Sequence, residues 1–235
     1  MGLVNFGNGI QMQHENLALI SDTTEFLARC EAKKIGIEEC TDFREWLAQS
    51  DQKSVEVALK TLKQCPEADH LWQKINQVQR ICVVSLPSSI VPTGRSLLAM
   101  NTILIGNNQS EEDQLYWLLF EIQNFSQKEK FEKLAEEALN GKVARELYTR
   151  QVEQIEFEAG VAGYELNNHC IKKSFWKLKN PAAFLLDEIS KQIGFDAFWS
   201  LLAKESAHAN KIRSQWDLIF KSIYCKKHPK DKDCL

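Results

Sequence analysis

Residues 101–125 have the sequence NTILIGNNQSEEDQLYWLLFEIQNF, and this stretch decides the fold of the chain. The β-branched run Met100–Ile105 predicts a strand, and Gly106-Asn107-Asn108 predicts the turn that ends it. Ser110, followed by three acidic residues, predicts the start of a helix, because its hydroxyl caps a free amide and the carboxylates complement the positive end of the helix dipole. The stretch therefore predicts a strand, a polar turn and a capped helix in direct succession.

The helix predicted over Ser110–Gln127 is apolar on nearly every side, which indicates that it is buried. Glu121 is the single charge near its middle. An ionised carboxylate in such surroundings costs free energy unless it is paired, hydrogen-bonded or open to a cleft. Glu121 is therefore the first candidate functional residue.

Phe120-Glu121-Ile122-Gln123-Asn124 resembles the H-E-x-x-H helix of zincin metallopeptidases, and the strand and turn before it match that family's layout. In zincins, the two histidines bind zinc and the glutamate acts as general base on a zinc-bound water. Aligned on Glu121, Phe120 and Asn124 stand at the two histidine positions. The resemblance covers about Ile81 to Leu166 and implies a zincin-like scaffold.

The resemblance also implies a third ligand, a carboxylate on a later helix. The helix predicted over Val143–Cys170 carries Glu153 and Glu156, which lie one turn apart on one face, so either could point at the site of Glu121. Together with Asn124, these three glutamates form the binding pocket that we expect.

The departures from the zincin motif predict a loss of hydrolysis. Phenylalanine cannot ligate zinc, and an oxygen-only set of glutamates and asparagine suits hard cations better than zinc. We therefore expect no metal, no cofactor and no catalytic residue, with Glu121 as the only candidate for one. The expected function is that of a non-catalytic protein-interaction, accessory or bacterial effector protein, a pseudoenzyme on a degenerate metallopeptidase scaffold.

Three alternatives stay open. Arg145 or Arg150 could pair with Glu121 in a hydrogen-bonded core network that has no pocket. The chain could also be an active hydrolase, either a metal-dependent peptidase with an unusual site or an enzyme with a cysteine nucleophile, such as Cys82 with His169. A zinc site could be formed by residues without motif spacing, namely His169, Cys170, His208 and Cys225.

Composition narrows the class of protein. The 235 residues carry a net charge of −3 and 44% hydrophobic residues, which gives no general attraction to nucleic acid or to anionic membranes. The seven cysteines form no C-x-x-C pair, so we expect no disulfides and a reducing compartment. No signal peptide and no membrane span are evident. We expect a cytoplasmic protein, or an effector secreted without a signal peptide, with a protein partner and an undetermined oligomeric state.

Few prolines and glycines interrupt the chain, which predicts a mainly α fold of the α+β class. We expect a helical N-terminal lobe over residues 1–80, a zincin-like core over 81–225 with two or three strands and a C-terminal helical bundle, and a solvated polar tail over 226–235, all in one compact domain. Strands are predicted at Ile81–Leu86 and Met100–Ile105. Helices are predicted at Glu15–Lys34, 42–49, Asp51–Gln64, 66–80, Ser110–Gln127, Lys128–Asn140, Val143–Cys170, Pro181–Ile193, Asp196–Ala207 and Asn210–Cys225.

Overall fold

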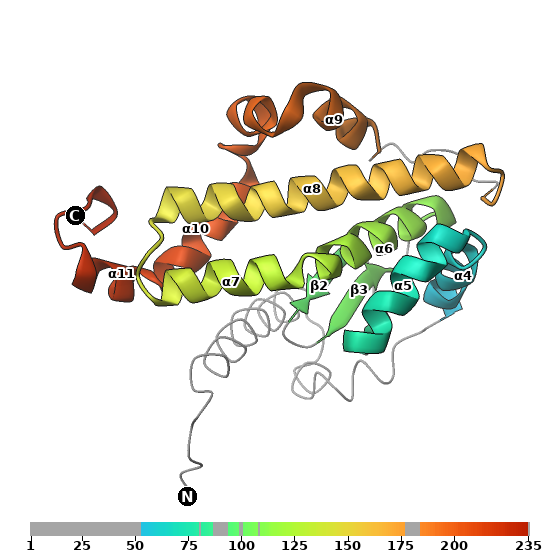
Figure 1. Ribbon diagram of the computed structural model, residues 1–235, viewed down its shortest axis with the longest axis horizontal. Coiled ribbons are helices and arrows are strands. Elements are labelled where there is room, and N and C mark those ends of the chain that lie inside the picture. Colours follow the sequence, from blue (N-terminus) through green and yellow to red (C-terminus); the bar gives the residue numbers. More distant parts are fainter. Residues whose placement is uncertain are drawn as a thin grey trace, which may run out of the picture.

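A computed structural model describes residues 53–79, 81–86, 94–98, 101–107, 109–176 and 184–234. These residues form a mostly helical structure with one small sheet, which confirms the mainly α, α+β class (Figure 1). The helices are α4 (Lys53–Leu62), α5 (Pro66–Gln79), α6 (Glu111–Ser126), α7 (Lys128–Leu139), α8 (Arg145–Lys172), α9 (Phe184–Phe198), α10 (Ala207–Ile219) and α11 (Lys221–Lys227). The helices predicted at Glu15–Lys34 and 42–49 lie outside the described residues.

The sheet has the order β1-β3-β2 and comprises β1 (Cys82–Leu86), β2 (Gly94–Leu97) and β3 (Thr102–Gly106). β1 and β3 are parallel, with Val84 opposite Leu104, and β2 runs antiparallel along the other side of β3, with Ser96 opposite Ile103. The sequence predicts β1 and β3 but not β2, whose residues GRSL contain no β-branched side chain.

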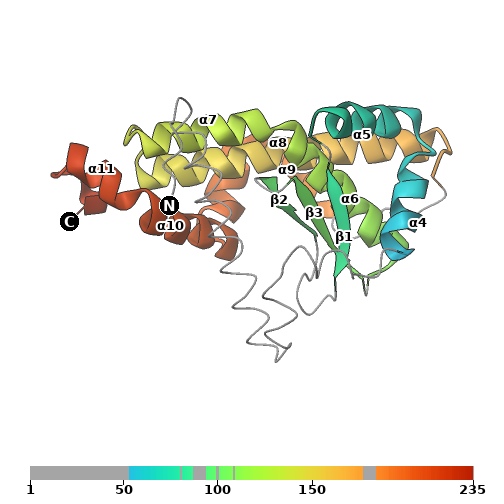
Figure 2. The same ribbon diagram turned by 90° about the horizontal axis from the view of Figure 1, so that it is seen from below.

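Helix α6 is the central element, because it contacts β2, β3, α4, α5 and α8. Its predicted cap is present: the Ser110 hydroxyl accepts the Asp113 N–H at 3.1 Å and donates to the Asp113 carboxylate at 2.9 Å. α7 continues the line of α6, and the long helix α8 runs back beside both (Figures 1 and 2). α8 packs against α6 at Gly163, where an added Cβ would lie 4.0 Å from the Phe120 Cα, an ordinary van der Waals contact.

Buried apolar side chains form two main clusters. The larger one joins α4, α5, the sheet and α6 to the end of α8, and it contains fully buried Leu62, Leu118 and Phe125. The second lies between α7, α8, α10 and α11 and is centred on Trp216, which is also fully buried. α8 takes part in both clusters and so holds the two halves of the molecule together.

The C-terminal helices differ in detail from the predicted spans. Gly194 interrupts α9 with a φ of 75°, and a short π-helix, Trp199–Ala203, follows. α10 and α11 are separate helices that meet at Phe220.

The expected polar tail is largely exposed over residues 226–234, but part of it is folded onto the molecule. A 3₁₀-helix, Lys232–Cys234, ends this segment, and Asp233 is buried against the start of α8. Among the described helices, none is long and apolar enough to cross a membrane.

Candidate functional site

Glu121 lies buried on α6 beneath the edge strand β2, with 4% of the residue exposed. The Ser96 hydroxyl donates a hydrogen bond to Glu121 Oε2 at 2.5 Å. At Gly94, an added Cβ would lie 3.2 Å from Glu121 Oε1 and 3.0 Å from the Trp117 Cβ. The strand that the sequence did not reveal therefore forms one wall of the Glu121 site.

Asn124 supplies the second polar contact. Its Nδ2 donates to Glu121 Oε2 at 3.2 Å, and the residue is only 5% exposed. Within the described part of the chain, Asn124 Oδ1 has no hydrogen-bond partner. The side chain at the position of the second zincin histidine is thus turned onto the glutamate.

Burial raises the pKa of Glu121, and the hydrogen bonds from Ser96 and Asn124 offset part of this rise. The positive charge of Arg95 acts in the same direction as those hydrogen bonds, more weakly.

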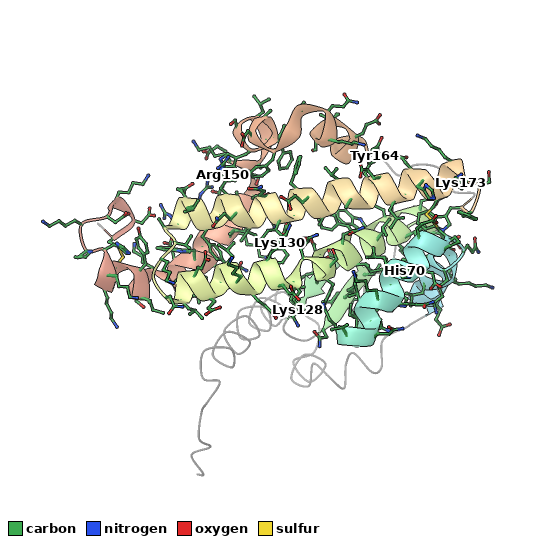
Figure 3. The ribbon with its side chains drawn as sticks, in the orientation of Figure 1. His70, Lys128, Lys130, Arg150, Tyr164 and Lys173 are labelled. Carbon is green, nitrogen blue, oxygen red and sulfur yellow. A yellow bond between two sulfur atoms is a disulfide. The ribbon has the colours of Figure 1, made fainter. Side chains whose placement is uncertain are left out.

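The two arginines that the sequence offered as partners of Glu121 lie elsewhere. Arg145 pairs with Asp217 at 3.2 Å and with Asp233 at 3.4 Å. Arg150 projects from α8 toward α9, where it meets Asp196 at 2.6 Å (Figure 3). The alternative of an Arg145–Glu121 or Arg150–Glu121 core ion pair is therefore wrong.

Glu153 and Glu156 both lie on the side of α8 that faces α10, where they meet His208. His208 Nδ1 lies 3.0 Å from Glu153 Oε1, and His208 Nε2 lies 3.5 Å from Glu156 Oε2. Glu153 is buried, while the side chains of Glu156 and His208 are 28% and 47% exposed. Each carboxylate thus has one imidazole nitrogen opposite it.

Two pKa values are raised in this cluster. The hydrogen bond to Glu153 raises the pKa of His208 to about 9, against the opposing effect of burial. Desolvation raises the pKa of Glu156 to about 7, and the negative charges of Glu153 and Glu121 contribute to that rise, while His208 lowers it. The charge of Glu121 on α6 is thus one of the causes of the raised pKa of Glu156 on α8.

Sequence reasoning did not identify Ser96 or His208 as members of this arrangement. Ser96 lies in β2, whose residues do not predict a strand. His208 lies 52 residues after Glu156 in the chain, and no known sequence motif joins residues at that separation. In the described part of the chain, no three His, Cys, Asp or Glu side chains are grouped so that they could hold a metal ion.

The expectation of no disulfides is wrong. Cys65 is bonded to Cys170, and Cys225 is bonded to Cys234. Cys170 and Cys225 are thus unavailable to the zinc set that the sequence allowed with His169 and His208. The pairing could not be predicted from the sequence, because the bonded cysteines, 105 and 9 residues apart, have no diagnostic spacing.

His169 does not take part in the Glu121 site either. Its Nε2 lies 3.0 Å from Glu67 Oε1 at the surface, where α5 meets the end of α8. The side chain of Cys82, its suggested nucleophilic partner, is not among those that the structure describes.

Comparison of the chain with protein-family models, with curated proteins and with solved structures gives no match in any of the three.

Proposed function

We propose that this chain is a non-catalytic interaction protein on a zincin-like scaffold whose metal site has been lost. The observation that carries the proposal is the contact between Asn124 and Glu121. The amide occupies the second histidine position and donates to the carboxyl that would serve as base. Phe120, at the first histidine position, offers no lone pair to a metal.

The arrangement around Glu121 supports this assignment. A strand and turn that lead into a buried helix with a central glutamate, and carboxylates on a later helix, agree with what the zincin resemblance implies. The hydrogen bonds from Ser96 and Asn124 satisfy Glu121 from within the chain. The role left for Glu121 is to join β2 to α6.

Exposed aliphatic side chains support an interaction role. Ile189 and Ile193 of α9 are 40% and 37% exposed, and Leu201 and Leu202 of the adjoining π-helix are 74% and 49% exposed. Such side chains on one pair of neighbouring elements are typical of protein-binding surfaces. Of the two locations that the sequence allows, the disulfides favour secretion, because they persist in oxidising compartments.

The test measures metal content and hydrolysis on the full chain. We expect purified protein to carry far less than one metal ion per chain in elemental analysis, and to leave a casein substrate intact. Glu121→Gln, which keeps the shape of the side chain, serves as the matched variant. Casein hydrolysis by the native chain that Glu121→Gln abolishes would show an active hydrolase instead.

A further inference from the structure

Both acidic residues of the C-terminal segment accept hydrogen bonds from within the molecule. Asp233, 4% exposed, accepts the backbone N–H of Arg145 at 3.1 Å and pairs with the Arg145 guanidinium. Asp231 accepts the N–H of Asp233 at 2.9 Å and the hydroxyl of Tyr224 at 3.0 Å. The backbone hydrogen bond is the main reason that the pKa of Asp231 is lowered, so its charge is held inside this network.

The lysines of the same segment remain at the surface. We define the basic end surface as six lysines of α11, the tail and the α7–α8 loop: Lys142, Lys221, Lys226, Lys227, Lys230 and Lys232. Five of them are exposed and Lys221 is half-buried. Within the described residues, none of the six forms a salt bridge; Lys227 donates only to the Asn140 carbonyl, at 2.7 Å.

These lysines are held in one place by the fold. The α7–α8 loop lies against α11, because His228 Nε2 approaches the Gly141 carbonyl at 2.9 Å. The Cys225–Cys234 disulfide closes the tail onto α11. α11 and the tail lie at one end of the molecule, far from the sheet and from α4 (Figures 1 and 2). The fold thus holds the six lysines at one end of the molecule.

We propose that the basic end surface binds an acidic segment of a partner protein. A surface of unpaired lysines attracts carboxylates, and its fixed shape lowers the entropy cost of binding. Leu218, three residues before Lys221, is 79% exposed and offers an apolar contact that a peptide side chain can match.

Features of this surface disfavour nucleic acid. None of its six residues is an arginine, which could make bidentate phosphate contacts. The tyrosine of α11, Tyr224, is buried and stacked on His228 with ring centroids 4.5 Å apart, so it offers no face to a base. Insertion of Leu218 alone into a membrane would bury little apolar surface, so it would contribute little to membrane binding. The inference extends the proposed interaction role but involves none of the residues around Glu121, so either can fail without the other.

The test measures fluorescence anisotropy of a labelled peptide of glutamates with interspersed leucines, titrated with the full chain at low salt. The variant Lys142→Glu/Lys226→Glu/Lys230→Glu reverses three charges of the basic end surface. Lys60→Glu/Lys74→Glu/Lys133→Glu changes the net charge equally at exposed sites elsewhere. We expect the first variant to weaken binding at least about tenfold and the second at most about twofold, since a local surface rather than net charge steers the peptide.

Equal losses in the two variants, or no binding by the native chain, would overturn the proposal. The proposal would also be overturned if the native chain bound a DNA duplex or phosphatidylserine vesicles more tightly than the peptide at the same salt concentration, and the first variant lost that binding. Cys225→Ser/Cys234→Ser keeps every lysine but releases the tail, and we expect it to weaken peptide binding several-fold. Unchanged binding by this variant would contradict the claim that a fixed surface is required.

Discussion

Gly94 lies so close to helix α6 that a side chain there has little room. An added Cβ would lie 3.0 Å from the Trp117 Cβ and 3.2 Å from the Glu121 Cγ. We predict that Gly94→Ala lowers the free energy of unfolding by about 1–3 kcal/mol, because β2 must move away from α6. Urea denaturation measures the change.

Gly163→Ala is the matched control for this prediction. The nearest atom to its added Cβ is the Gln123 Cγ at 3.8 Å, an ordinary contact, and alanine is the better helix former within α8. It should cost nothing or stabilise the chain by up to about 1 kcal/mol. Equal costs for both variants would argue against the close packing of β2 on Glu121.

The His208 cluster predicts how stability depends on pH. The folded chain holds a proton on Glu156 up to about pH 7 instead of 4.5, and on His208 up to about pH 9 instead of 6.5. Because both pKa values are raised, stability should fall as pH rises from 4.5 to 9. The lowered pKa of Glu146, caused mainly by its hydrogen bond from Arg213, has the opposite effect and removes stability below pH 4.5. The free energy of unfolding should therefore be greatest at about pH 5.

Thermal melts across this range measure the effect. In His208→Gln the fall between pH 6.5 and pH 9 should largely disappear, because the imidazole proton that responds to Glu153 is gone. His70→Gln, which removes an exposed histidine of α5, should leave the profile unchanged. A His208→Gln profile identical to that of the native chain would show that this cluster does not set the pH dependence.

At the scale of elements, the start of α8 is stabilised by the tail rather than by a local cap. The side chain of Ala144 does not cap the helix. Instead, Asp233, which lies 88 residues after Arg145 in the chain, accepts the backbone N–H of Arg145. We predict that Asp233→Asn lowers the free energy of unfolding by about 2 kcal/mol, because a buried charged acceptor is lost.

Asp196→Asn provides the comparison. The Asp196–Arg150 pair is shorter, at 2.6 Å, but Asp196 is 88% exposed, so its loss should cost less than about 1 kcal/mol. A larger effect at Asp196 than at Asp233 would contradict the capping role.

Local signals explain which elements could be predicted. The cap at Ser110, the β-branched runs of β1 and β3 and the apolar spacing of the helices lie within short windows of sequence. Among the described residues, the structure contains the capped α6, both strands and helices α4, α5, α7 and α8, whereas the helices predicted after residue 180 have different bounds. β2 could not be predicted, because its GRSL residues form a strand only through pairing with β3. The contacts of Ser96, His208 and the bonded cysteines depend on distant segments, which one sequence does not reveal.

At the scale of the molecule, the two disulfides close loops of very different size. Cys65–Cys170 joins the α4–α5 turn to the end of α8 across 105 residues, whereas Cys225–Cys234 spans 9. Chain entropy predicts that Cys65→Ala/Cys170→Ala lowers the free energy of unfolding by about 5 kcal/mol and Cys225→Ala/Cys234→Ala by about 3 kcal/mol.

Urea denaturation of the two double variants measures these costs, and mass spectrometry of the native protein without reductant identifies the bonds. Four free thiols at these positions in protein secreted through an oxidising compartment would contradict the pairing.

The most direct test of the zincin-like account is to restore the lost ligands. Phe120→His/Asn124→His should bind about one zinc ion per chain in a calorimetric titration, with a zinc-dependent rise in melting temperature, whereas the native chain should not. Glu129→His/Lys133→His places two histidines at the same spacing on the exposed face of α7 and should bind far more weakly. If the Phe120→His/Asn124→His chain binds zinc no better than this control, the scaffold around Glu121 is not zincin-like.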